Sequence, residues 1–159
     1  MINQEREREL LRERALGWAM TCEEVMPGID LGRDISLVEG PNGLDFARVS
    51  GMDNLAQSLK VALTTCLGSD IFNTDFGFDG LNALAEESNA LLVRERVRIS
   101  IIRLLRKDPR VRSIVDVKVG NERLNPSVTR DRILDVRVIF EVVSGDQLTV
   151  DLGRVITNV

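Results

Sequence analysis

The sequence predicts an α+β domain in which one long helix packs on a three-stranded antiparallel sheet. Residues 89–107 repeat apolar side chains at the i, i+3, i+4 spacing of a helix with one buried face, namely Ala90, Val93, Val97, Ile101 and Leu104. The C-terminal third instead alternates apolar and polar residues in three segments, as half-buried strands do. The 159 residues match one domain, and a chain of that size buries about 70% of its unfolded surface.

Residues 1–43 are expected to form a helix and an irregular extension of a compact domain that spans residues 44–159. Glu and Arg interleave through residues 3–16 at spacings that allow i,i+3 and i,i+4 ion pairs, which predicts a solvated helix. Proline and glycine interrupt residues 21–34 and predict irregular structure there. Two β-prone runs that flank the loop at residues 39–43 predict a short N-terminal hairpin.

A helix is expected over residues 54–67, with Asp53 or Asn54 as its N-cap and Gly68 after its end. Its predicted core face consists of Leu55, Leu59, Ala62 and Leu63. A short helix is expected over residues 80–87.

The loop at residues 69–80 carries three phenylalanines: Phe72, Phe76 and Phe78. A loop with three large aromatic side chains is stabilised when it folds onto a core and buries them. We therefore expect all three rings to be shielded from water.

Ser88 is expected to cap the long helix over residues 89–107, and Pro109 to end it. The predicted strands of the sheet are residues 115–119, 134–142 and 148–152. Their alternation predicts one buried face, with these apolar residues on it: Val115, Val117, Val119, Leu134, Val136, Val138, Phe140, Val142, Leu148, Val150 and Leu152.

The composition excludes several kinds of chemistry. The chain has no histidine and no tyrosine, one tryptophan, and only two cysteines, Cys22 and Cys66. No imidazole is available for Ser–His–Asp or Cys–His catalysis or for a histidine-ligated metal, and two distant cysteines cannot build a zinc site. We expect free thiols in a reducing compartment, no metal and no cofactor.

No apolar stretch approaches the roughly 20 residues of a membrane span, and the charged first residues show no secretory signal. We therefore expect no membrane partner.

Two carboxylate pairs are candidates for catalysis, Glu86 with Glu87 and Asp75 with Asp79. Glycoside hydrolysis needs two carboxyl groups about 5–10 Å apart across a cleft, and the spacing selects neither pair. A calcium loop needs about six oxygen ligands in register, a pattern that is missing. We expect no enzymatic activity, and a peptidoglycan-cleaving, lysozyme-like hydrolase is the alternative.

Charge is distributed unevenly along the chain. Residues 1–80 carry 14 acidic and 7 basic side chains, whereas residues 89–112 carry 8 basic and 2 acidic ones. The basic segment makes Arg94, Arg98 and Arg103 candidate contacts for an acidic partner, and a merely solvated face is the alternative. The arginines do not form one stripe and the net charge is −4, so we expect no nucleic-acid partner.

The tripeptide Asp108-Pro109-Arg110 marks the exit from the long helix. Proline fixes the geometry of this exit, and a guanidinium is suited to bidentate pairing with a carboxylate. An ordinary helix stop is the other interpretation of this motif.

Several short motifs, in this order and spacing, resemble one known family. They are Asn54-Leu55-Ala56-Gln57-Ser58-Leu59, Leu63-Thr64-Thr65-Cys66-Leu67-Gly68, Asn73-Thr74-Asp75-Phe76-Gly77 and Lys107-Asp108-Pro109-Arg110. Together with the predicted sheet they resemble the baseplate wedge, sheath-initiator family of contractile phage tails. Related proteins occur in type VI secretion and extracellular contractile injection system baseplates. The resemblance covers roughly residues 44–157, and Asp108 stands where the family usually has Glu.

This resemblance implies a structural protein that binds wedge proteins near the hub and initiates sheath polymerisation by strand addition. The implied partners are the wedge proteins, through Asp108, Pro109 and Arg110, and the tail sheath protein, with possible contacts to hub, spike and tube-initiator proteins. It also implies about six copies around a sixfold baseplate. The expected location is a virion tail baseplate assembled in the bacterial cytoplasm, or a cytoplasmic particle if the assembly is an injection system.

The last predicted strand is the expected site of sheath binding. Its residues are Leu148, Thr149, Val150, Asp151 and Leu152. We expect a short edge strand protected only lightly by charge, and an uncovered edge offers backbone groups to an extended arm of another chain. The alternative is an edge that residues 155–159 cap.

Overall fold

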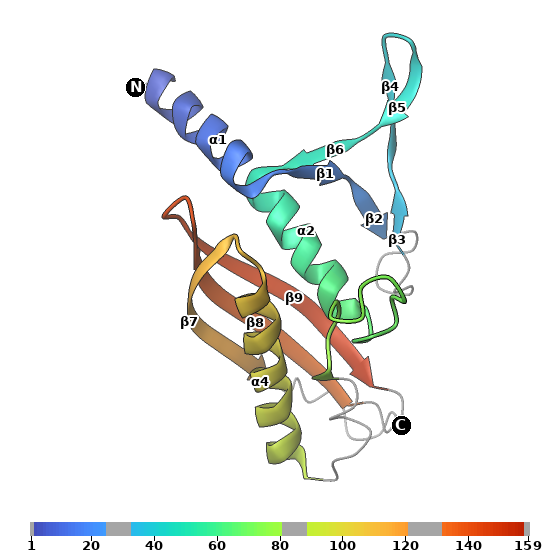
Figure 1. The fold of residues 1–159 in the computed structure, drawn as a ribbon, viewed down its shortest axis with the longest axis vertical. Helices are drawn as coiled ribbons and strands as arrows, with labels where there is room; N and C mark the ends of the chain where they lie inside the picture. Colours follow the sequence, from blue (N-terminus) through green and yellow to red (C-terminus); the bar gives the residue numbers. More distant parts are fainter. Residues whose placement is uncertain (1, 25–32, 81–88, 121–131, 158–159) are drawn as a thin grey trace. The chain divides into compact units, whose positions relative to one another are not determined.

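A computed structural model describes residues 2–24, 33–80, 89–120 and 132–157 of the chain. The chain divides into two units, residues 1–58 and 59–159, and each is described by itself. The described residues form helices and antiparallel sheets, which confirms the α+β class (Figure 1). None of the described helices is long and apolar enough to cross a membrane.

In the first unit, three short antiparallel ladders meet at one junction (Figure 1). The ladders are β1 (Trp18–Met20) with β6 (Arg48–Ser50), β2 (Cys22–Glu24) with β3 (Arg33–Ile35), and β4 (Leu37–Gly40) with β5 (Gly43–Phe46). Between them, the backbone N–H of Thr21 donates to Ala47, that of Ala47 to Ser36, and that of Ser36 back to Thr21, each at 2.9 Å. This closed ring pairs the backbone groups at the point where the ladders separate.

The junction corrects one prediction and confirms another. Residues 21–34 are not irregular throughout, because β2 and β3 occupy the two described ends of that segment. The predicted hairpin is present as β4 and β5, joined by a two-residue turn at Pro41 and Asn42.

Helix α1 (Ile2–Leu16) precedes the ladders, and most of its described residues are exposed, as predicted. Leu10 and Leu11 are more than half exposed, whereas Leu16 at the end of the helix is 1% exposed. Trp18 is also exposed, and the Arg48 guanidinium lies 4.6 Å from the centre of its ring.

Helix α2 (Gly51–Thr64) begins earlier than predicted. Gly51 has φ +62° and donates its N–H to the Gly17 carbonyl at 3.0 Å, so the entry to the helix is made by a glycine. Asp53 and Asn54 are therefore not caps: both lie in the first turn of the helix, and Asn54 is buried. The predicted apolar face is confirmed, since all four of its residues are buried: Leu55, Leu59, Ala62 and Leu63.

In the second unit, helix α4 (Ala90–Lys107) packs against the first strand of the C-terminal sheet. Asn89, not Ser88, is its N-cap, because the Asn89 side chain accepts a hydrogen bond from the Leu91 N–H at 2.9 Å. Among the described side chains, the buried face of the helix is the predicted one and also includes Leu105, which is fully buried. The full set is Val93, Val97, Ile101, Leu104 and Leu105.

The sheet contains β7 (Val111–Gly120), β8 (Arg132–Val142) and β9 (Gln147–Thr157), in that spatial order. Figure 1 shows α4 lying across one face of it. The buried side chains of the sheet come from predicted apolar positions of all three strands, namely Val117, Val136, Val138, Phe140, Val142 and Val150. Strand β9 has 11 residues, so the expectation of a short last strand is wrong.

The loop between α2 and residue 80 is held to the helix end by backbone contacts. Phe78 donates to the Thr65 carbonyl at 2.8 Å, and Leu67 donates to the Phe78 carbonyl at 3.2 Å. Of the three phenylalanines, Phe78 is 2% exposed, Phe76 is partly buried and Phe72 is 94% exposed. The expectation that all three rings are shielded is therefore wrong for Phe72.

Candidate binding surfaces

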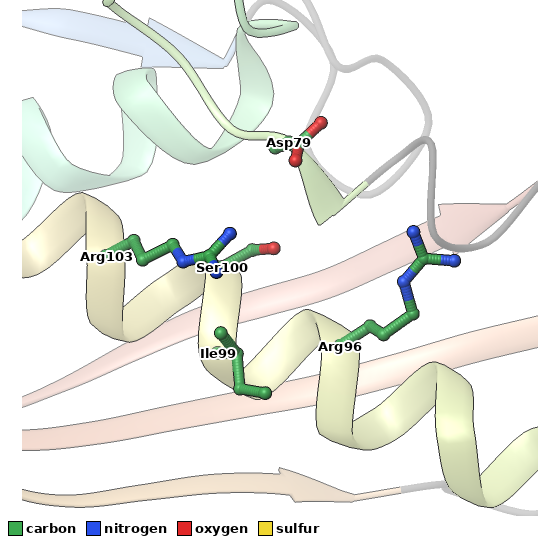
Figure 2. A pocket seen from close by; sticks show the side chains of 5 residues that line it. All are labelled: Asp79, Arg96, Ile99, Ser100 and Arg103. Atoms are coloured by element: carbon green, nitrogen blue, oxygen red, sulfur yellow. The ribbon is translucent and has the colours of Figure 1, made fainter.

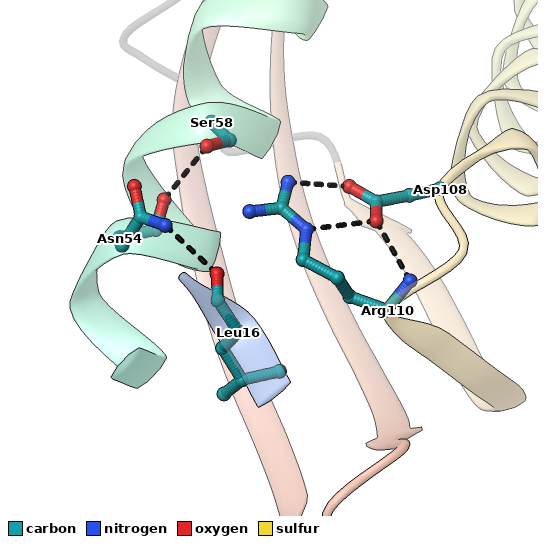
Figure 3. A network of polar contacts seen from close by, with 5 residues as sticks. All are labelled: Leu16, Asn54, Ser58, Asp108 and Arg110. Carbon is teal, nitrogen blue, oxygen red and sulfur yellow. Dashed lines mark hydrogen bonds and ion pairs between the residues drawn. The ribbon is translucent and has the colours of Figure 1, made fainter. Parts of the chain in front are cut away.

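The turn from α4 into β7 contains an internal ion pair. The Arg110 Nε donates to Asp108 Oδ1 at 2.9 Å, and Nη2 donates to Oδ2 at 2.7 Å (Figure 3). The Arg110 backbone N–H also donates to Oδ1 at 2.9 Å. Pro109 between them is exposed. Asp108 therefore holds the guanidinium that the sequence motif suggested for a partner's carboxylate.

This ion pair changes the acidity of Asp108. Burial alone raises the pKa of a carboxyl group, because it disfavours the charged form. The side-chain and backbone hydrogen bonds from Arg110, together with its charge, outweigh this effect. The pKa of Asp108 consequently lies below its ordinary value of 3.8.

Strand β9 forms one edge of the sheet. It pairs with β8, and no other described strand pairs with it. The pairing is continuous from Gln147 to Asp151, and the register shifts only beyond Asp151. Strand β7, at the opposite edge, has two register shifts along its pairing with β8. Bulges of this kind hinder the addition of a further strand, so β9 offers the more regular edge.

The register identifies which backbone groups of β9 point away from β8. The Val142 N–H donates to the Asp146 carbonyl at 2.9 Å and so closes a hydrogen-bonded pair at the end of the ladder. Hydrogen-bonded and non-hydrogen-bonded pairs alternate in antiparallel ladders. Thr149, opposite Ile139, therefore directs its N–H and C=O to the free edge, whereas Val150, opposite Val138, directs them to β8.

One side of α4 lines a pocket of about 260 Å³ together with Asp79 from the preceding loop. Figure 2 shows Arg96 and Arg103 on two turns of the helix, with Ser100 and Ile99 between them and Asp79 across from the helix. A second pocket of about 220 Å³ continues from Asp79, Ser100 and Arg103 toward Lys107. The Lys107 Nζ donates to the Asp75 carbonyl at 2.9 Å, which ties this end of the helix to the loop.

The three arginines predicted to contact an acidic partner do not lie together. Only Arg103 lines the pocket. At 100° per residue, Arg94 is about 180° and Arg98 about 140° around the helix from Arg103. Arg98 is paired instead with Glu95, at 4.0 Å. Arg96 was missed as a site residue, although its angular position, about 20° from Arg103, was available from the sequence.

Of the two candidate carboxylate pairs, Asp75 and Asp79 lie among the described residues. Glu86 and Glu87 lie outside the described residues. Asp75 and Asp79 are both exposed, and Asp79 lines the two pockets on α4. Within the described ranges, no three acidic or cysteine side chains gather as a metal site would require.

No protein-family model matches the sequence, and no curated protein matches it. The fold matches a chain in the cryo-EM structure of the anti-feeding prophage baseplate, symmetrised sixfold. That match has a TM-score of 0.51 and 19% sequence identity, and it covers 86% of this chain and 91% of the matched chain. The two chains therefore share a fold over most of their lengths.

Proposed function

We propose that this protein is a non-enzymatic structural component of a contractile-tail or contractile-injection-system baseplate, where it binds the wedge and initiates the sheath. The observation that carries the proposal is the shared fold with a chain of the anti-feeding prophage baseplate, which extends over 86% of this protein. The family resemblance of the sequence motifs points to the same assembly independently of the fold.

The regular edge of β9 supports a role in sheath initiation. Strand addition needs a stretch of unpaired N–H and C=O groups, and the partner's alternate side chains then set the register. Gln147 to Asp151 provide an unshifted stretch of this kind. We propose that an extended arm of a first-ring sheath subunit pairs here.

A proline scan of β9 tests sheath initiation. Thr149→Pro removes an N–H that points to the free edge, so the variant should fold and enter baseplates but leave them without sheath in electron micrographs. Thr149→Ala keeps the N–H and should support normal sheath growth. Val150→Pro removes a donor to β8 and should disrupt the domain itself. Normal sheath on baseplates that contain folded Thr149→Pro would exclude this strand as the initiation site.

We also propose that Asp108, Pro109 and Arg110 form the wedge-binding surface. The exposed Pro109 lies between two partly buried side chains, and their mutual ion pair gives the turn a defined geometry. A carboxylate on the wedge would add to the contacts of Arg110 or compete with Asp108 for them.

Arg110→Ala should abolish co-purification with wedge proteins, and Arg112→Ala is the matched control. Arg112 is two residues away and 65% exposed, and it pairs with Glu141 at 3.4 Å. Circular dichroism of both variants separates binding from folding. If Arg110→Ala unfolds the chain, the motif is a structural brace and the wedge assignment is wrong.

A further inference from the structure

The two pockets along α4 are adjacent, because Asp79, Ser100 and Arg103 line both of them, and we treat them as one groove. We call this the α4 groove. Its basic side chains, Arg96, Arg103 and Lys107, occupy one side of the helix within about 40° of one another. Ile99 and Leu104 add apolar surface to the groove, and Leu67 and Gly77 line it from the loop.

We propose that the α4 groove binds an acidic segment of a partner protein, with its carboxylates on Arg96 and Arg103. Guanidinium groups bind carboxylates through paired, charge-assisted hydrogen bonds. The planar guanidinium presents two N–H groups that match the two oxygens of one carboxylate. Arg96 and Arg103 are seven residues apart, which places them about 10 Å apart along the helix axis. The segment therefore carries at least two acidic residues separated by a similar length, with apolar atoms between them over Ile99.

Two features of the groove favour a bound segment over a merely solvated surface. Lys107 is tied to the Asp75 carbonyl at 2.9 Å, so one end of the groove is fixed to the loop that forms its opposite wall. That loop is itself held to the end of α2 by the backbone bonds of Phe78 and Leu67. Preformed walls reduce the conformational entropy that a partner must remove on binding.

Asp79 acts against an acidic ligand, because its carboxylate lines both pockets beside the same arginines. It contributes a negative charge where the ligand's carboxylates bind. Removing this charge should therefore strengthen binding, whereas removal of an arginine should weaken it. If the groove attracted acidic ligands only through its overall charge, substitutions of Arg96 or Arg103 would weaken binding no more than substitutions of other arginines of the helix.

The site is tested with the full-length chain and a fluorescein-labelled hexaglutamate peptide, by fluorescence anisotropy near 0.15 M salt. At this ionic strength the Debye length is about 8 Å, so charges on the far side of α4 contribute little. We expect the double variant Arg96→Gln/Arg103→Gln to weaken binding by about ten-fold, since two charge-assisted pairs are lost. The matched control, Arg94→Gln/Arg98→Gln, removes the same net charge from the opposite side and should change binding by less than about two-fold. Asp79→Asn should tighten binding.

Equal weakening by both double variants would mean that the peptide responds to the net charge of the helix, and would overturn the proposal. Unchanged binding in Arg96→Gln/Arg103→Gln would overturn it as well. A labelled 12-nucleotide single strand serves as a second probe. If it binds through Arg96 and Arg103 more tightly than the peptide does, the groove is a nucleic-acid site and the assignment to an acidic protein segment is wrong. These measurements need no baseplate, so their failure is distinguishable from failure of the proposed function.

Discussion

The carboxylate of Asp108 holds the guanidinium of Arg110 through two hydrogen bonds, at 2.9 Å and 2.7 Å, across a single proline. The Asp108 side chain is 14% exposed and that of Arg110 is 24% exposed, so water competes only weakly for either partner. The pair orients the chain as it leaves α4 and enters β7. The motif for which the sequence predicts a partner contact therefore forms an ion pair within this domain.

Asp108→Asn should lower the free energy of unfolding by about 1–3 kcal/mol, because it leaves the half-buried Arg110 without its counter-charge. The effect should depend on pH. The pKa of Asp108 is lower in the folded chain than its ordinary 3.8, so the ion pair stabilises the fold fully above that value. This stabilisation is lost as the pH falls through the lower, folded pKa. Urea titrations between pH 7 and pH 2 should show that the difference in free energy of unfolding between wild type and Asp108→Asn becomes smaller at acid pH.

Position 77 requires glycine for two reasons: its backbone has a positive φ, and there is no room for a Cβ atom. Its φ is +109°, and a Cβ there would lie 2.7 Å from the carbonyl oxygens of Thr65 and Cys66. Gly43 has a similar φ of +112°, but a Cβ there would have no neighbour within 4 Å. Gly77→Ala should therefore destabilise the chain by at least about 2 kcal/mol more than Gly43→Ala, the excess measuring the steric clash. Equal losses in chemical denaturation would show that the loop shifts to accept the methyl group.

Asn54 links the start of α2 to the end of α1. It is 3% exposed, and its Nδ2 donates to the Leu16 carbonyl at 2.9 Å. Figure 3 shows this bond together with the one from Ser58 Oγ to the Asn54 carbonyl. Asn54→Ala should cost about 1–3 kcal/mol, because it removes the donor to a buried carbonyl. Asn42→Ala, at an exposed turn position, should cost less than about 0.5 kcal/mol in the same denaturation assay.

The elements with strong periodic patterns were predictable from sequence. The helical faces at Leu55, Leu59 and Val97 came directly from the 3.6-residue repeat, since burial of one face produces that repeat. The alternation in β8 likewise identified Val138 and Phe140 as core residues. These patterns reflect which face of an element is buried, and they were therefore sufficient to predict the α+β fold class.

Local irregularities were not predictable in the same way. The alternation of Val115 with Val117 suggested that both face the core, but a register shift between Ile114 and Asp116 leaves Val115 58% exposed. A bulge adds one residue and moves the following side chains to the other face, and no composition signal marked it. The junction at Thr21 is also set by backbone bonds between distant residues, which no local pattern encodes.

The candidate binding surfaces were predictable only where all of their residues lie on one element. The angular spacing of Arg96 and Arg103 on α4 follows from the sequence alone. The position of Asp79 opposite them depends on how the loop folds back, which the sequence did not indicate. Likewise, Asp108 and Arg110 were recognised as a motif, but their mutual pairing required the geometry of the turn.

The two outer phenylalanines of the loop at residues 69–80 should differ sharply in their contribution to stability. Phe72 is 94% exposed and its N–H is held by Asp70 Oδ1 at 2.9 Å, so its backbone is fixed while its ring faces water. Phe72→Ser should therefore change the free energy of unfolding by less than about 0.5 kcal/mol. Phe78 is 2% exposed, and Phe78→Ala should cost about 3–5 kcal/mol through lost burial and the cavity that remains. Chemical denaturation of the two variants measures the difference between their free energies of unfolding, provided that their m-values are equal. A loss above 2 kcal/mol in Phe72→Ser would show that its ring is shielded in solution, as the sequence pattern first suggested.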